Sequence, residues 1–366
     1  MLVTAAIRRD SSLRLAICTF FALLLSLPAI AQTAPPQPNA LQRLLALHLP
    51  KLDGEYSTYY SPEAKTQALR SQAEITKCAN WYSQQLHVKI PVTIAVINQA
   101  DWNRIGDLIP YPMPQAESGD VIFMPDSFAS YPGQISGAHL AAKLDFISFH
   151  ETGHLFQHAL KLHSPDLFMQ EFDATLFATA YALATHPELI TATLDSRSAA
   201  KQRYTSFEDM DLIYIGVGFG NYDWFQIEML RLAVFFAKGQ DLATLVSKLR
   251  AAFPAGQFLT TQQIFAKTDA IRPGFLALAG NLAGPTTLPL LTPGKCVASP
   301  VKQNADSTFG IWNASGHPIA VVDDGTAATL PPGSSAQQGK LGAQFQLPNG
   351  SSCITYPKEP GYIVLH

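Results

Sequence analysis

The pattern of apolar and polar residues changes its period along the chain, and each period predicts a different kind of element. Apolar positions that recur every three to four residues predict helices at about 39–48, 61–86, 136–162, 166–184, 222–237 and 241–252, with a short one near 261–266. Two β-branched runs, Pro91–Ile97 and Asp120–Pro125, predict strands. Because proline is best tolerated at the border of a sheet, the second run predicts an edge strand at Val121–Met124.

Beyond about residue 291 the helical period disappears. Short β-type runs alternate there with turn sequences such as Asn349-Gly350, which lies between two runs as in a hairpin. The whole pattern predicts an α+β protein in which a small mixed sheet at 32–135 packs on a mainly helical part at 136–290. A small β-sandwich-like module is expected at 291–366.

The N-terminal segment predicts export. Three arginines precede an apolar run at 15–27, which Pro28 and the small-residue site Ala29-Ile30-Ala31 follow. This order is typical of a secretory signal peptide, so we expect residues 1–31 to be removed by cleavage after Ala31. The mature protein is then secreted or periplasmic, and no stable membrane insertion is expected after cleavage.

Composition narrows the function classes. The chain has 366 residues, 47% of them hydrophobic, and a formal net charge of −3. Without a basic stripe, nothing in it favours nucleic acid as a partner. Loss of Cys18 with the signal peptide leaves three cysteines, for which we expect a Cys296–Cys353 disulfide and a buried thiol at Cys78.

One stretch carries a defined chemistry: His150-Glu151-Thr152-Gly153-His154, an H-E-x-x-H motif within an expected helix. Residues i and i+4 share a helix face, so His150 and His154 can bind the same metal ion. Glu151 lies next to the first ligand, where it can act as a general base without ligating the metal.

A catalytic zinc needs a third protein ligand. Gln157 and Leu160 occupy the positions that the metzincin layout would require to be Gly and His, so that layout is excluded. His158 is four residues beyond His154 but drifts around the helix relative to His150. The segment Phe168–Ala174 on the next expected helix offers two acids, Glu171 and Asp173.

That segment resembles the W-L-N-E-G-F-A signature that follows H-E-x-x-H in the gluzincin zinc metallopeptidases, particularly the aminopeptidase-N-like enzymes of the peptidase MA group. The resemblance implies a gluzincin core and Glu171 as the third zinc ligand. The spacing from His154 is two residues shorter than in the aminopeptidases, so strict counting would favour Asp173 instead. If Glu171 is the ligand, Asp173 is either a hydrogen-bonding partner of a ligand His or a helix-start carboxylate.

A second, looser likeness concerns Tyr222 at the start of an expected helix. In the same enzymes a Tyr at a helix start stabilises the tetrahedral intermediate, a role that the resemblance gives to Tyr222, with Tyr204 and Tyr214 as rivals. The aminopeptidase motif G-x-M-E-N, which binds the free amine of the substrate, has no counterpart on the strand at 120–125.

The resemblance therefore implies an exported zinc metallopeptidase that hydrolyses a peptide or protein substrate, with zinc as cofactor and Glu151 and Tyr222 as catalytic residues. The expected edge strand Val121–Met124 would align an extended substrate. The alternative is a secreted zinc-binding protein that is catalytically inactive or not a peptidase, with a binding or structural role. The general base discriminates between them, since a decayed site usually loses it and Glu151 is present.

Overall fold

The computed structural model describes residues 38–106, 113–127, 137–162, 167–195, 203–213, 219–254, 259–291, 309–323, 326–332, 335–338, 344–347, 350–353 and 361–365. The expected signal peptide at 1–31 and Cys296, one half of the expected disulfide, lie outside these residues. Cys78 is a buried free thiol, as expected. The chain divides into Met1–Pro38 and Asn39–His366, and only the second unit is described below.

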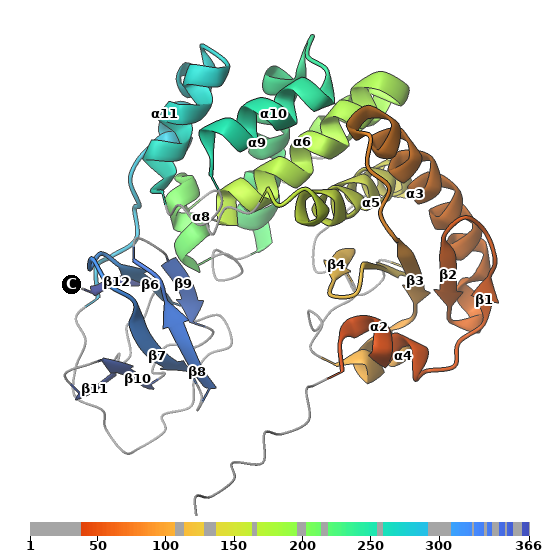
Figure 1. Ribbon diagram of the computed structural model, residues 1–366, viewed down its shortest axis with the longest axis horizontal. Coiled ribbons are helices and arrows are strands. Elements are labelled where there is room, and N and C mark those ends of the chain that lie inside the picture. Colours follow the sequence, from red (N-terminus) through yellow and green to blue (C-terminus); the bar gives the residue numbers. More distant parts are fainter. Residues whose placement is uncertain are drawn as a thin grey trace, which may run out of the picture. The chain divides into compact units, whose positions relative to one another are not determined.

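The predicted α+β class with a small mixed sheet is confirmed (Figure 1). Five strands lie in the order β1-β2-β3-β5-β4. Parallel pairing joins β2 to β3 and β3 to β5, whereas β1 and β4 are antiparallel to their neighbours. The strands are β1 (Lys51–Leu52), β2 (Ser57–Tyr60), β3 (Thr93–Ile97), β4 (Gln115–Glu117) and β5 (Val121–Pro125).

The predicted edge position of Val121–Met124 is wrong. Strand β5 lies between β3 and β4, and the edge on that side is the three-residue β4, for which the sequence predicted no strand. The proline is tolerated because it is the last residue of β5, opposite Ile97. The carbonyl of Ile97 is satisfied by the N–H of Asp126, at 3.1 Å, so the missing N–H of Pro125 leaves no gap there.

Alternate residues of the central strands enter two different hydrophobic clusters, as the two-residue period of a strand requires. Ile94 and Ile122 pack with helix α3 (Lys65–Leu86) and the helices beyond it. Ala95 and Phe123 pack with α2 (Ala40–Leu45) and α4 (Gln99–Ile105). Both faces of the sheet are therefore covered by helices, which explains why these strands are apolar throughout.

Helices follow the sheet. Those predicted at 136–162, 166–184, 222–237, 241–252 and 261–266 are present and agree to within a few residues at most ends, whereas the helices at 187–195, 207–213 and 275–279 were not predicted. The helices are α5 (Gly137–Ala159), α6 (Leu167–Thr185), α7 (Pro187–Asp195), α8 (Phe207–Ile213), α9 (Phe219–Ala237), α10 (Leu242–Ala252), α11 (Thr261–Ile271) and α12 (Phe275–Ala279). Helix α11 extends well beyond the predicted end at 266. Among the described helices, none combines the length and the apolar character needed to span a bilayer.

Among the described residues, seven short strands follow the helices, as the change of pattern after residue 291 predicts. They are β6 (Phe309–Asn313), β7 (Ile319–Asp323), β8 (Thr326–Leu330), β9 (Ser335–Gln338), β10 (Gln344–Leu347), β11 (Gly350–Cys353) and β12 (Gly361–Leu365). A hairpin is present as the antiparallel pair β10–β11, but Gly350, predicted to lie in the turn, is the first residue of β11 and pairs with Leu347. The other strands form the sheet β12-β6-β9 and the pair β7-β8.

Candidate metal centre

The two histidines of the motif lie on one face of α5 with their rings perpendicular, at an angle of 89° and 4.6 Å between centroids. His154 Nδ1 is 3.1 Å from Gln157 Oε1. Because an amide oxygen only accepts, the proton of His154 is on Nδ1, and its Nε2 keeps a lone pair. His150 Nδ1 has the hydroxyl of Thr175 as partner, at 3.1 Å. Both rings are thus held through Nδ1, which leaves Nε2 as the atom that could bind a metal.

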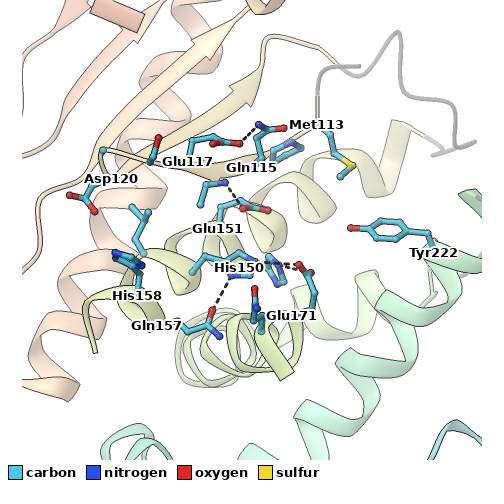
Figure 2. Close-up of a pocket in the computed structure, with 17 residues that line it drawn as sticks. Met113, Gln115, Glu117, Asp120, His150, Glu151, Gln157, His158, Glu171 and Tyr222 are labelled. Carbon is cyan, nitrogen blue, oxygen red and sulfur yellow. Dashed lines mark hydrogen bonds and ion pairs between the residues drawn. The ribbon is translucent and has the colours of Figure 1, made fainter. Parts of the chain in front are cut away.

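Glu171 on α6 faces both free nitrogens. Its Oε2 is 3.4 Å from His150 Nε2, and its Oε1 is 3.7 Å from His154 Nε2. Ligand atoms around a tetrahedral zinc are about 3.4 Å apart, given metal–ligand distances near 2.1 Å. His150, His154 and Glu171 therefore form a group that could hold a metal ion. Figure 2 shows His150 and Glu171 side by side in the cavity.

The close approach of α5 and α6 depends on Gly153. A Cβ at this position would lie 2.9 Å from the carbonyl oxygen of Ala174 and 3.0 Å from the Cβ of Phe177. No side chain fits there without moving α6 away from α5. The second unspecified position of the H-E-x-x-H motif must therefore be glycine here, since Gly153 lets α6 come close enough for Glu171 to reach the histidines.

The N-terminal end of α6 is fixed by α8. Asp211 accepts a hydrogen bond from the backbone N–H of Phe168 at 2.5 Å, in the first turn of α6. Its other oxygen accepts from the hydroxyl of Thr261 at 2.7 Å. A carboxylate in this place satisfies an unpaired helix N–H and complements the helix dipole. It holds the turn of α6 that precedes Glu171.

Burial and the charges of neighbouring residues together set the pKa values of the group. Burial raises the pKa of Glu171, but the hydrogen bond with His150 and the charges of both histidines outweigh it and lower that pKa to about 2. Burial also lowers the pKa of His150, yet Glu171 and Glu151 more than compensate, so this pKa is raised. For His154, burial and the neighbouring His150 lower the pKa to about 4. The carboxylate is therefore anionic, and one imidazole stays neutral at ordinary pH.

Glu151 is buried, and its Oε2 accepts a hydrogen bond from the backbone N–H of Ala116 at 2.7 Å. Ala116 is the central residue of the edge strand β4. Burial, with help from the charge of Glu171, raises the pKa of Glu151 to about 8 against the opposing effect of His150. A raised carboxyl pKa is a property of groups that exchange protons in catalysis, although buried structural acids share it.

Asp173 is buried on α6 but is not part of the metal-binding group found among the described residues. It hydrogen-bonds to Gln157, the side chain that holds His154, and burial raises its pKa well above the usual range. Its Oδ1 has no hydrogen-bond partner among the described residues. Asp173 therefore reaches His154 only through Gln157, and the structure places Glu171, not Asp173, beside the two histidines.

Tyr222 reaches the same site from α9, and Figure 2 shows its ring directed toward Glu151 and Glu171. Gln226 Nε2 donates to the Tyr222 hydroxyl at 3.0 Å and to Glu171 Oε2 at 3.3 Å, which ties the tyrosine to the metal-binding group. Of its rivals, Tyr204 is buried in a hydrophobic cluster with α8 and α9, and Tyr214 lies outside the described residues.

These groups line one cavity of about 560 Å³. Its walls are β4, the turn at 118–120, α5, the start of α6, and Tyr222. His158 lies on the wall, on the opposite side of the labelled cluster from Tyr222 (Figure 2), and is not part of the group that could hold a metal ion among the described residues. Sequence reasoning missed the roles of Thr175, Gln157, Gln226 and Ala116. The role of Thr175 could have been predicted from the sequence, because it lies four residues after Glu171 and so shares its helix face.

Comparison of the sequence with protein-family models and with curated proteins finds no match in either set.

Proposed function

We propose that this protein is an exported zinc metallopeptidase. The observation that carries the proposal is the joint placement of His150 Nε2, His154 Nε2 and a Glu171 oxygen within 4.8 Å of one another, beside the buried Glu151. Two imidazoles and a carboxylate, all held in place by other side chains, are a donor set typical of catalytic zinc. Three protein ligands leave a fourth position open for water or substrate.

The spacing of Glu171, His150 and His154 suits ligands of a divalent cation better than side chains that hydrogen-bond directly to one another. The distances from Glu171 to the two imidazoles, 3.4 and 3.7 Å, are long for charge-assisted hydrogen bonds, which favour about 2.8 Å. These distances are close to those between two ligand atoms that bind the same metal ion. Two nitrogen donors with one oxygen favour zinc over magnesium or calcium, which prefer oxygen ligands only.

In the proposed reaction, bound zinc would polarise the scissile carbonyl and acidify a water molecule. Glu151 takes the proton of the attacking water and gives it to the leaving amine. Ala116 occupies Oε2 of Glu151, which leaves Oε1 for the proton. A tyrosine hydroxyl can donate as well as accept, so Tyr222, which accepts from Gln226, could stabilise the developing oxyanion.

The edge strand that aligns the substrate would be β4, in place of the β5 segment that the sequence indicated. Ala116 directs its N–H at Glu151, so the free edge of β4 borders the general base. An extended peptide paired with this edge would cross the site beside Glu151. The helices α5 to α9 would then form a gluzincin core, and the strands after residue 309 a β-sandwich-like module.

The test is metal analysis of the purified mature protein combined with digestion of an unfolded protein substrate. We expect about one zinc per chain and cleavage that a chelator abolishes and added zinc restores. Glu151→Gln should keep the zinc and lower kcat by about 10²–10⁴-fold, because an amide still accepts a hydrogen bond but takes up no proton. Full zinc content with no cleavage would favour the binding role, and undiminished cleavage by Glu151→Gln would refute the mechanism.

A further inference from the structure

A second, smaller cavity of about 70 Å³ lies beside the metal-binding group. It shares Met113, Pro114, His150, Glu151 and Tyr222 with the larger cavity. A substrate whose reacting carbonyl lies between Glu151 and Tyr222 therefore has this cavity directly next to it. Its remaining walls come from α5, α6, α7 and α9, away from the edge strand.

Much of the wall is apolar. Phe146, Ile227 and Leu230 are buried side chains of α5 and α9, and Ile147 is half-buried. A cavity of about 150 Å³ lined by such residues accepts benzene, so one of about half that size suits a branched aliphatic group and not an aromatic ring. The volume and the apolar lining therefore both favour a side chain of the leucine or valine type.

The cavity also has one ion pair in its wall. Lys143 Nζ of α5 is 2.6 Å from Asp223 Oδ1 of α9, and the side chains are only 9% and 15% exposed. Paired in this way, the two charges cancel, so neither is available as a counter-ion to an incoming group. A charged side chain would lose its hydration there without gaining a counter-ion, which disfavours its entry.

We propose that this cavity is the subsite for a branched aliphatic side chain of the substrate residue next to the cleaved bond. The Lys143–Asp223 ion pair offers no counter-ion and so excludes acidic and basic side chains. The inference rests on the peptidase function proposed above. It adds the substrate class, namely peptides with an aliphatic residue at the cleaved bond.

The test measures binding separately from turnover. Zinc-loaded protein is titrated by calorimetry with four short hydroxamates that differ only in the side chain next to the chelating group: leucine, glycine, phenylalanine and aspartate types. We expect the leucine type to bind about 10- to 100-fold more tightly than the glycine type. The other two should gain nothing over glycine. Equal affinities, or no binding of any of the four, would overturn the subsite.

Digestion of an unfolded protein by the same preparation tests the peptidase function separately. Cleavage combined with equal hydroxamate affinities would reject the subsite and keep the peptidase. A clear leucine preference in binding without any cleavage would reject the peptidase and keep the subsite.

Variants of the ion pair sharpen the result. Asp223→Asn removes the charge that balances Lys143, so the aspartate type should gain about 10-fold and the leucine type should lose affinity. Lys143→Met should instead favour a lysine-type hydroxamate. An ion pair that only joins α5 to α9 would lower stability in both variants and leave the order of affinities unchanged, which would refute its role in selectivity.

If the charge variants fail to fold, Ile147→Phe provides a second test. Ile147 is only half-buried, so a larger side chain there should leave the protein folded. Filling the cavity should remove the leucine preference while glycine-type binding persists. A leucine preference that survives Ile147→Phe would overturn the assignment.

Discussion

Two buried carboxylates, Asp209 and Glu171, differ in how their oxygens are satisfied. Asp209 is fully buried on α8 and receives hydrogen bonds from the Thr286 hydroxyl at 2.6 Å and from the Thr287 N–H and hydroxyl at 2.7 Å each. A weaker bond from the N–H of Ser206 completes the set, at 3.4 Å. Glu171 has instead one amide donor at 3.3 Å and two imidazoles at 3.4 and 3.7 Å.

The difference separates a structural acid from a functional one. The donors of Asp209 come mainly from the segment after α12, so the carboxylate joins parts of the chain distant in sequence, and nothing further is needed to stabilise its charge. The neighbours of Glu171 are instead two imidazoles, whose Nε2 atoms lie 3.4 and 3.7 Å from its oxygens and are nitrogen donors that a cation could bind. A buried acid that faces two imidazole nitrogens at 3.4 and 3.7 Å is thus the better indicator of a metal centre.

The largest expected effects come from removing each of the two acids, because one removal should affect zinc binding and the other the stability of the fold. Glu171→Ala should weaken zinc binding by about 10³-fold or more, because one of three protein ligands is lost, with little loss of thermal stability in the metal-free protein. Asp209→Ala should leave zinc stoichiometry intact and lower the free energy of unfolding by about 3 kcal/mol or more, since several donors lose their acceptor. Competition with a chromogenic chelator and thermal melts measure the two quantities.

The comparison breaks if the results are reversed. Zinc binding that survives Glu171→Ala, or that disappears in a folded Asp209→Ala protein, would mean that hydrogen-bond satisfaction does not distinguish the two acids.

A smaller effect is expected for the residues behind His154. Gln157→Leu removes the partner of His154 Nδ1, and Asp173→Ala removes the acid that hydrogen-bonds to Gln157. Each should weaken zinc binding by about 10- to 100-fold at most. If Asp173 acts through Gln157, the double variant should cost no more than Gln157→Leu alone, in a double-mutant cycle on zinc affinity. Additive losses would show that Asp173 has a separate role.

Gly153→Ala tests how closely α5 and α6 must pack. The added methyl meets the backbone of Ala174, so α6 must move, at a cost of about 1–3 kcal/mol that exceeds the gain of up to about 1 kcal/mol in helix propensity. Zinc affinity should fall as well, since α6 carries Glu171. Gly316→Ala is the control, because no heavy atom lies within 4 Å of the added carbon. Unchanged zinc affinity in Gly153→Ala would separate helix packing from the metal site.

These residues also show how far sequence reasoning reached. The helix pair carrying His150, His154 and Glu171 was predictable, because the motif spacing and the apolar periodicity agree there. Strand β4 was not: three residues between Pro114 and Ser118 are too few to show a strand period, and their pairing depends on β5. Ala116 and Gln157 were missed as partners of Glu151 and His154. A backbone N–H and an amide side chain belong to no sequence motif, and they gain a role only through tertiary contacts.

The smallest expected effect concerns Glu208, beside the structural acid. Burial, together with the charges of Asp211 and Asp209, raises the pKa of Glu208 to about 7 from an ordinary value of 4.5. A carboxyl whose pKa is raised on folding favours the folded state below about pH 4.5, and this contribution is lost as the pH rises through about 7. The ionised form is therefore unfavourable in the folded protein at pH 8.

Glu208→Gln should accordingly melt at a higher temperature than the wild type at pH 8, and at the same temperature at pH 4. Because Glu208 is partly exposed, solvent screening reduces the effect to about 1 kcal/mol, or about 2 °C in this large a chain. Thermal melts of both proteins at the two pH values measure it, and zinc affinity, which depends on the other acid site, should not change. A stabilisation that is equal at pH 4 and pH 8 would show that the loss of charge is not its cause, and that Asp209 and its neighbours tolerate a third ionised carboxylate without cost.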